Sequence, residues 1–303
     1  MTAGHDPALF LLALDHRQSL RDKLLGIDGT PTATQLEGIR DVKRLIFEGA
    51  EAAVRHGADP DSVGLLVDEE YGAYVLEPAR AAGMKVAVPV EKSGRDELEF
   101  EHGDRFGEHL SAVDPDFAKV LVRLNPEGDR DANQRQLGRL VRLSDWLASH
   151  DRPLLFELLV PPEPAQLDAV DGSRDRYDRE LRPGLMVEAI ERIQDAGVQV
   201  AVWKIEGLEN RADCERIAAQ TRRGGRNDVV CVLLGRGADP DRVDHWLRQA
   251  APVEGFVGFA IGRSIWWEPI RAYLEGAMER QQVADAIATN YLRFVAVFEE
   301  ARV

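Results

Sequence analysis

The sequence predicts a closed (β/α)8 barrel that forms a single domain over residues 1–303. Short apolar runs typical of buried strands alternate with longer segments of helical period from one end of the chain to the other. Eight such units in about 300 residues favour a closed barrel over an open, doubly wound sheet. No GxGxxG motif follows the first apolar run, which also argues against a dinucleotide-binding fold.

The expected strands are apolar runs bounded by polar or turn-forming residues, at 9–17, 62–70, 85–93, 117–125, 153–161, 198–206, 228–237 and 255–264. Between them, apolar residues recur at helical spacing, as in 36–46, 137–147 and 186–193. Turns that contain glycine or Asp-Pro, such as 56–60, precede several strands. The segment 161–183 is the longest stretch that we expect to be irregular, and it would form either a lid over the catalytic face or a plain surface insertion.

Composition narrows the range of partners. A net charge of −15 repels a polyanion, so nucleic acid is not expected to bind, although a local basic pocket could still hold a small anionic substrate. No apolar run approaches the length of a membrane span, and the first ten residues lack a basic stretch followed by an apolar one. Cys214 and Cys231 lack metal-ligand spacing and suggest a reducing compartment, so we expect a cytoplasmic protein. The sequence leaves the oligomeric state open, and a homo-oligomer is one option.

Lysine is rare in this chain, because only six of the 38 basic residues are lysines. An arginine guanidinium stays protonated and cannot act as a nucleophile, so each lysine raises the question of whether an amine is needed. Lys23, Lys43 and Lys85 fit ordinary helix-surface or strand-entry positions. The remaining three, Lys92, Lys119 and Lys204, lie at or within expected strands, and Lys204 interrupts the apolar run VQVAVWKIEGL.

Strand alternation predicts a charged cluster inside the barrel. Lys119, Glu157 and Lys204 fall on three successive strands and would share the inner side, with Trp203 packed outward under the helices. Burial beside a second cation favours the neutral form of the Lys204 amine, which can attack a ketone and form an imine. Glu157 would carry protons during these steps. The alternative is a buried structural ion network without chemistry.

Other polar residues collect at the ends of the expected strands, where barrel enzymes place their active sites. The first strand ends in Asp15, His16 and Arg17, and the third in Glu91 and Lys92. The last two strands end in Gly-Arg pairs, and barrels frequently bind phosphate at these two loops through exposed backbone N–H groups. This predicts a phosphate site formed by Gly235, Arg236, Gly262 and Arg263.

A metal site is the weaker hypothesis for the acidic run Asp68, Glu69 and Glu70, which would need Asp15 or His16 as further ligands. The other histidines considered fall in helix or loop patterns and are expected on the surface: His56, His102, His109, His150 and His245. The default for Glu69 and Glu70 is a polar rim. The pair Trp266-Trp267 is expected to serve packing or a subunit contact.

Several motifs together resemble the class I aldolase barrels of the tagatose-1,6-bisphosphate aldolase type. They are LALDHRQSL, VPVEKSG, FAKVLVRLNP, LLFELLVPP, VWKIEG, LLGRGAD and GFAIGRSIWWEP, spread over residues 10–270. The resemblance is closer to the aldolase-like domain fused to some 5-dehydro-2-deoxygluconokinases of inositol catabolism. It implies Lys204 as the Schiff-base lysine, Glu157 as the acid/base, Lys119 and Asp15 as further catalytic residues, and Arg263 as a phosphate ligand. The first strand reads Asp-His-Arg instead of Asp-Gln-Arg, and the seventh lacks a serine-containing turn, which argues against tagatose bisphosphate as substrate.

The predicted function is therefore a lyase that cleaves a phosphorylated keto sugar or keto acid through a lysine Schiff base. The preferred substrate is 5-dehydro-2-deoxygluconate 6-phosphate, whose carboxylate would need a further cation from Arg17, Lys92 or Arg182. This mechanism requires no metal and no organic cofactor. The alternatives are an aldolase for tagatose bisphosphate or a sulfonated sugar phosphate, a metal-dependent aldolase, and a barrel that binds sugar phosphates without catalysis.

Overall fold

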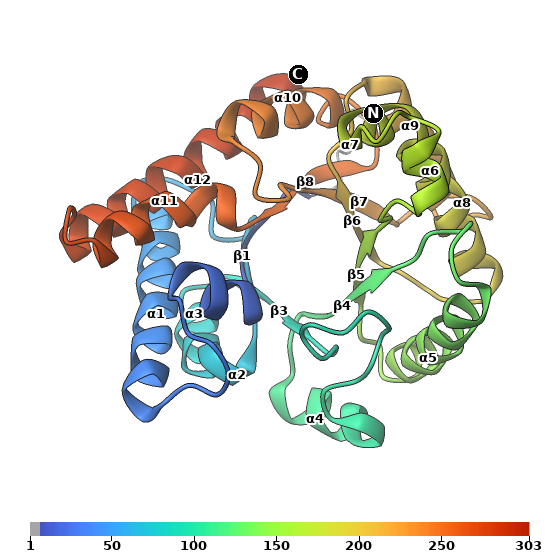
Figure 1. The fold of residues 1–303 in the computed structure, drawn as a ribbon. Helices are drawn as coiled ribbons and strands as arrows, with labels where there is room; N and C mark the ends of the chain where they lie inside the picture. Colours follow the sequence, from blue (N-terminus) through green and yellow to red (C-terminus); the bar gives the residue numbers. More distant parts are fainter. Residues whose placement is uncertain (1–6, 303) are drawn as a thin grey trace, which may run out of the picture.

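The computed structural model describes residues 7–302 and confirms the predicted closed (β/α)8 barrel. Eight parallel strands follow one another around the barrel in chain order, and β8 pairs with β1 to close it (Figure 1). The strands are β1 (Leu9–Leu14), β2 (Val63–Val67), β3 (Lys85–Pro89), β4 (Phe117–Arg123), β5 (Leu154–Leu159), β6 (Val202–Glu206), β7 (Val230–Leu234) and β8 (Phe256–Ile261). Each lies within its predicted range.

Helices surround the barrel on its outer side (Figure 1). The longer ones are α1 (Ala33–Arg55), α4 (Phe106–Val113), α5 (Arg130–Ser149), α8 (Arg182–Asp195), α9 (Arg211–Thr221), α10 (Pro240–Ala250), α11 (Arg263–Leu274) and α12 (Arg280–Arg302). The shorter ones are α2 (Glu69–Gly72), α3 (Leu76–Ala81), α6 (Pro164–Asp168) and α7 (Arg174–Arg176), with single turns η1 (Leu20–Leu24), η2 (Ala73–Val75), η3 (Gly103–Arg105) and η4 (Tyr177–Leu181). None of the described helices is long and apolar enough to cross a lipid bilayer.

Side-chain caps fix where several helices begin. Thr32 accepts a hydrogen bond from the backbone N–H of Gln35, whose side chain in turn accepts one from the Thr32 backbone, so α1 starts with a capping box. Asp239 caps α10, and Pro240 occupies its first position, where the missing N–H costs nothing. The turn after β7 is thereby directed away from the barrel axis into a helix.

Two apolar cores lie on either side of the sheet. The inner one fills the barrel with side chains such as Leu11, Leu66 and Val232, and the outer one joins strands to helices. Trp203 belongs to the outer core, 4.9 Å from the ring of Phe156, as the strand alternation predicts. Its neighbour Lys204 therefore points into the barrel.

Two expectations about local structure are wrong. Strand β6 begins only at Val202, four residues after the start of the expected strand 198–206, and Val200 packs in the outer core. The segment 161–183 is not irregular, because it contains α6, α7, η4 and the start of α8. A capping box at Glu163 and the Ser173 hydroxyl, which accepts a hydrogen bond from the Arg176 N–H, begin helices too short to show a clear period.

Lys43 is also misplaced by the sequence, which predicts it on a helix surface. Its side chain is completely buried, donates to the backbone carbonyls of Leu14 and His16, and pairs with the Asp68 carboxylate. Lys43 lies four residues after buried Ile39 on α1, so it points toward the barrel with the apolar residues of that face. The acidic partner lies 25 residues away in sequence, and this is why the burial was not predicted.

Candidate active site

A polar cavity of about 480 Å³ opens at the carboxyl ends of the strands. Its wall contains ten of the eleven residues to which the predicted aldolase mechanism gives a catalytic or binding role, all but Arg182: Asp15, Arg17, Lys92, Lys119, Glu157, Lys204, Gly235, Arg236, Gly262 and Arg263. Residues that are distant in sequence meet here because every strand of a parallel barrel ends at the same face. The structure thus brings the predicted set together, while the chemical roles stay predictions.

The centre of the cavity holds an ion cluster around Lys119. The Lys119 Nζ lies 2.9 Å from Asp15 Oδ2, 2.7 Å from Glu91 Oε1 and 3.0 Å from Glu157 Oε2. The same Glu157 oxygen lies 3.0 Å from the Nζ of Lys204. One carboxylate oxygen therefore contacts both lysines, as the placement on successive strands predicts.

Strand register explains this geometry. Glu157 of β5 is directly opposite Lys204 of β6, and both side chains point inward. On the other side, Lys119 pairs with Leu155, one inward position below Glu157, so its long side chain extends upward to the carboxylate. The inner-core side chains, Leu155 and Val202 among them, close the barrel beneath the cluster.

Opposite charges in the cluster stabilise the ionised forms of one another. Burial alone would raise the pKa of Asp15 and of Glu157, but the ammonium of Lys119, helped by that of Lys204, lowers both pKa values below their usual range. Burial would lower the pKa of Lys119, yet Asp15, Glu157 and Glu91 together raise it well above its usual value. Lys119 is therefore a permanent cation that keeps two carboxylates ionised.

Glu91 is a member of the cluster to which the sequence assigned no role. It follows β3, is buried, and accepts a hydrogen bond from Lys119, while burial raises the pKa of its carboxyl group. Its position at a strand end is the signal that could have marked it, because Asp15 was chosen by the same criterion. Alternation over the expected run 85–93 is a second signal, because Glu91 is in phase with the inward-facing Ala87.

Comparison with known proteins gives the chain a family. A family model described as "Uncharacterized protein conserved in bacteria (DUF2090)" matches residues 2–302. The chain belongs to the DUF2090 family.

The chain is also similar, at low sequence identity, to several proteins named as aldolases. The chain is 23% identical over 283 residues to "Tagatose 1,6-diphosphate aldolase 2" of Enterococcus faecalis (strain ATCC 700802 / V583), covering 87% of this chain and 80% of that protein. Among solved structures it is similar to a fructose-bisphosphate aldolase from Plasmodium falciparum, with a TM-score of 0.64, 12% identity, and coverage of 97% of this chain and 91% of the other. A Schiff base forming fructose-1,6-bisphosphate aldolase gives a TM-score of 0.55 at 13% identity, with 93% of each chain covered. This DUF2090 chain therefore shares the class I aldolase fold.

The loops after β7 and β8 form one end of the cavity. A side chain at Gly262 would collide with the carbonyl oxygen of Ala13 and the ring of His16, so only glycine lets β8 end so close to β1. Arg263 begins α11 directly after it, at the helix end that favours anions. No carboxylate in the described part of the chain forms an ion pair with Arg263, whose guanidinium donates to the Arg236 carbonyl at 3.0 Å.

Arg236 is held differently from Arg263. Its guanidinium pairs with Asp178 at 2.5 Å and with Glu206 at 3.2 Å, so its charge is already balanced by two carboxylates. Its backbone is in the left-handed region, at φ 54°, between two glycines. Of the two arginines that the sequence assigns to phosphate, Arg263 is the one whose charge is not offset by a described ion pair.

Arg182 cannot serve as the cation on a mobile lid, as the sequence suggested. Its side chain is completely buried at the start of α8, pairs with Asp178 and Glu206, and donates to the Gly207 carbonyl at 2.8 Å. A buried guanidinium needs such partners, which is why Arg182 belongs to the ion network behind Arg236 instead of the cavity wall.

Arg17 and Lys92 do reach the cavity wall. Arg17 is tied to Glu101 at 3.0 Å and donates to the Glu91 carbonyl at 2.6 Å, so it fixes the loop that follows β3. Lys92 is more than a third exposed, and its ammonium lies 3.5 Å from the Glu99 carboxylate. Lys92 is therefore the freer of the two cations.

The acidic run after β2 does not join Asp15 or His16. Asp68 is enclosed with Lys43, and Glu69 points to His109 on α4, with 2.5 Å between their nitrogen and oxygen atoms. His16 lines the cavity, and burial lowers the pKa of its imidazole to about 3, so the ring is neutral at physiological pH. A metal site made of the acidic run with Asp15 or His16 is thus ruled out by geometry.

Proposed function

We propose that this protein is a class I aldolase that cleaves a phosphorylated keto sugar or keto acid through a Schiff base on Lys204. The observation that carries the proposal is the Glu157 oxygen, 3.0 Å from the Nζ of both Lys204 and Lys119 within the cavity. The distant relationship to a tagatose diphosphate aldolase and the fold of Schiff-base-forming aldolases support it. The proposed substrate is 5-dehydro-2-deoxygluconate 6-phosphate, which would place the enzyme in inositol catabolism.

Imine formation requires an amine that gives up protons and a carbonyl oxygen that gains them. After the Lys204 Nζ has given up a proton, it adds to the substrate ketone, and the resulting carbinolamine loses its hydroxyl as water to leave an iminium ion. Glu157 touches the amine and can accept its proton and return it to the departing hydroxyl. Lys119 stays protonated, so it stabilises the carboxylate form of Glu157 between these transfers.

Carbon–carbon cleavage then uses the iminium ion as an electron acceptor. A base removes the proton from the hydroxyl on the β-carbon, counted from the iminium carbon. The bond between the α- and β-carbons then breaks, and its electron pair forms an enamine. We assign Asp15 to the binding of substrate hydroxyls, because its carboxylate is ionised and held by Lys119 beside the reacting centre. Protonation of the enamine and hydrolysis of the imine release dihydroxyacetone phosphate, and the other fragment is malonate semialdehyde.

The phosphate is assigned to Arg263, Gly262 and Gly235, with Arg236 at the edge of the site. Arg263 has no described carboxylate competing for it and stands at a helix N-terminus that faces the cavity. A substrate carboxylate is assigned to the opposite wall, where Lys92 and Arg17 lie. The two anionic ends of the substrate would thus span the lysine cluster.

Borohydride reduction in the presence of dihydroxyacetone phosphate, followed by peptide mass analysis, tests the proposal. The expected result is one stable adduct on the peptide that contains Lys204, and none in Lys204→Met. An adduct on another lysine would identify that residue, and not Lys204, as the nucleophile. Binding of the phosphate without any adduct, unchanged in Lys204→Met, would instead support a barrel that binds sugar phosphates without catalysis.

Tagatose 1,6-bisphosphate is the second candidate substrate, because a relative named as a tagatose 1,6-diphosphate aldolase matches 87% of this chain. A panel of phosphorylated ketoses that includes a sulfonated sugar phosphate, read as release of dihydroxyacetone phosphate, separates the candidates. We expect the keto acid to be cleaved fastest. Loss of activity in chelator would favour a metal-dependent aldolase.

A further inference from the structure

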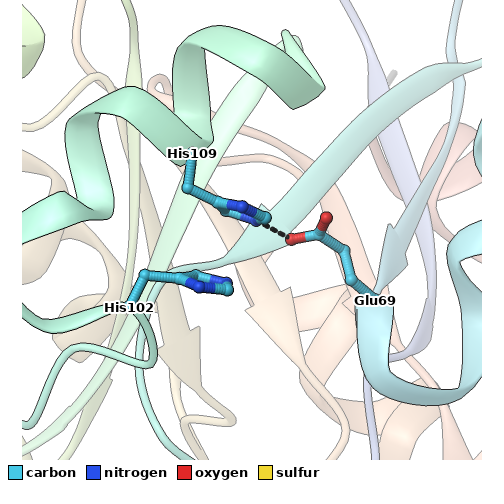
Figure 2. A group of neighbouring side chains, drawn as sticks. All are labelled: Glu69, His102 and His109. Carbon is cyan, nitrogen blue, oxygen red and sulfur yellow. Dashed lines mark hydrogen bonds and ion pairs between the residues drawn. The ribbon is translucent and has the colours of Figure 1, made fainter.

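Three side chains that could bind a metal ion meet outside the active-site cavity (Figure 2). They are Glu69, the first residue of α2, His102, which follows the loop after β3, and His109 on α4. One ligand atom from each lies within 4.8 Å of the others. None of the three lines the active-site cavity.

The two imidazole rings lie face to face, with 3.6 Å between ring centroids and 23° between ring planes, and His109 contacts the Glu69 carboxylate. The sequence predicts both histidines as isolated surface residues, because their partners come from separate elements. Two imidazole nitrogens and one carboxylate oxygen form a ligand set that suits zinc and related transition metals, whereas magnesium and calcium prefer oxygen alone.

We propose that Glu69, His102 and His109 form a site for one divalent transition-metal ion of the zinc type. Zinc bonds of about 2.1 Å in a tetrahedral arrangement separate ligand atoms by roughly 3.4 Å. The His109 and Glu69 atoms, 2.5 Å apart, would have to separate by about 1 Å to share an ion, and the His102 ligand atom lies within 4.8 Å of them. Solvent reaches the site, because His102 is exposed.

The protein holds two parts of this site in place before an ion binds. Asp68, next to Glu69, is fixed by Lys43 and caps α2 through the Tyr71 N–H at 2.9 Å. Phe106 lies between the two histidines in the sequence, and its buried ring packs on that of Phe100, with 4.6 Å between ring centroids. Two of the three ligands thus come from anchored segments, which lowers the entropic cost of binding the ion.

An ion here would fasten one wall of the active-site cavity. Residues 91–98 line that wall, and the segment returns to the barrel through a backbone bridge between Glu91 and Phe100. Glu101, which pairs with Arg17, directly precedes His102. The inferred role is structural, since the ion would join α2, α4 and the base of this loop, and it does not depend on the proposed aldolase activity.

Zinc titration of the untagged, chelator-treated and dialysed full chain tests the site. Calorimetry should give about one zinc per chain, thermal unfolding should shift upward with zinc, and cobalt(II) should give a visible absorption band of a nitrogen- and oxygen-ligated site. Magnesium should leave the unfolding temperature unchanged.

Variants locate the ion. His102→Ala and Glu69→Gln should each weaken zinc binding at least about 10-fold and remove most of the thermal shift. His102 is exposed, so its loss is not expected to disturb folding. The matched control is His150→Ala, which removes a surface histidine stacked on Trp146 and should bind zinc like the wild type. Binding by His102→Ala and Glu69→Gln equal to that of the wild type, or no zinc bound by the wild type, would overturn the proposal.

Discussion

Two buried lysines on opposite sides of the barrel wall show how the same ammonium group can serve two purposes. Lys43 lies behind the first two strands, where Asp68 and two backbone carbonyls accept its hydrogen bonds. Lys204 points into the barrel, on the cavity wall, and forms an ion pair with a single Glu157 oxygen that also contacts Lys119. Lys43 has all three of its donors engaged by protein, whereas Lys204 faces space that a substrate can enter.

The comparison teaches that burial of a lysine does not by itself indicate catalysis. The two lysines differ in whether a ligand in the cavity can reach the ammonium group. They also differ in the number of hydrogen-bond partners that the protein supplies to it. We expect Lys43 to stabilise the fold by fixing the end of β1. We expect Lys204 to take part in catalysis.

The largest expected effect is on catalytic activity, and it distinguishes Lys204 from Lys43. Lys204→Met should lower kcat on the order of 10⁴-fold or more, because it removes the amine on which the proposed covalent intermediate forms. Its fold should persist, since Glu157 keeps Lys119 as a counterion. Steady-state kinetics on the best substrate from the ketose panel, with circular dichroism, measures both. Lys85→Met, at an exposed strand entry, is the control and should keep wild-type rates.

The next effect concerns stability. Lys43→Met should lower the free energy of unfolding by about 3–5 kcal/mol, because it leaves the Asp68 carboxylate buried without a cation. The double variant Lys43→Met with Asp68→Asn should recover part of this loss, since asparagine can still cap α2. Urea unfolding checks both variants. A loss below about 1 kcal/mol in the single variant would show that the pair is not a structural anchor.

A smaller effect tests the two arginines at the phosphate end. Arg263→Gln should raise KM about 10- to 100-fold by removing charge-assisted hydrogen bonds, with little change in kcat. Arg236→Gln should raise KM less, because Asp178 and Glu206 already offset its charge. Equal effects would mean that a bound substrate draws Arg236 away from its carboxylates.

The smallest expected effect is in pH dependence. The pKa of Asp15 is lowered in the folded state, so its ionised form stabilises the protein above the unfolded pKa of about 4 and loses this contribution as pH falls. Because the loss sets in only below the unfolded pKa, the decrease in unfolding free energy between pH 7 and pH 3 should be about 1 kcal/mol smaller in Asp15→Asn than in the wild type. Urea unfolding at the two pH values measures the difference. An equal pH dependence in both proteins would mean that Lys119 does not stabilise the Asp15 carboxylate.

Much of the barrel and of its candidate site was predictable because strand alternation acts over short distances. The eight apolar runs located every strand, and the inward positions of Lys119, Glu157 and Lys204 followed from counting residues. The pairing of Glu157 with both lysines required only that neighbouring strands end at one face.

Contacts between separate elements were not predictable in this way. The Lys43–Asp68 pair and the meeting of Glu69 with His102 and His109 each depend on how a helix lies against a loop. Arg182 was misjudged because the short helices of 161–183 carry too few residues to show a period. Glu91 lies two residues after the end of β3, in phase with the inward-facing Ala87, but its partner Lys119 comes from the next strand.

The apolar side chains that fill the barrel affect how a ligand enters and leaves the cavity. In the described part of the chain, Leu11, Leu66 and Val232 fill the barrel beneath the charged cluster, which lies in the cavity at the carboxyl ends of the strands. Under the proposed function, both products would leave along the path by which the substrate entered. The fragment bonded to Lys204 would leave last, so the covalent bond and the filled barrel would together set the order of release.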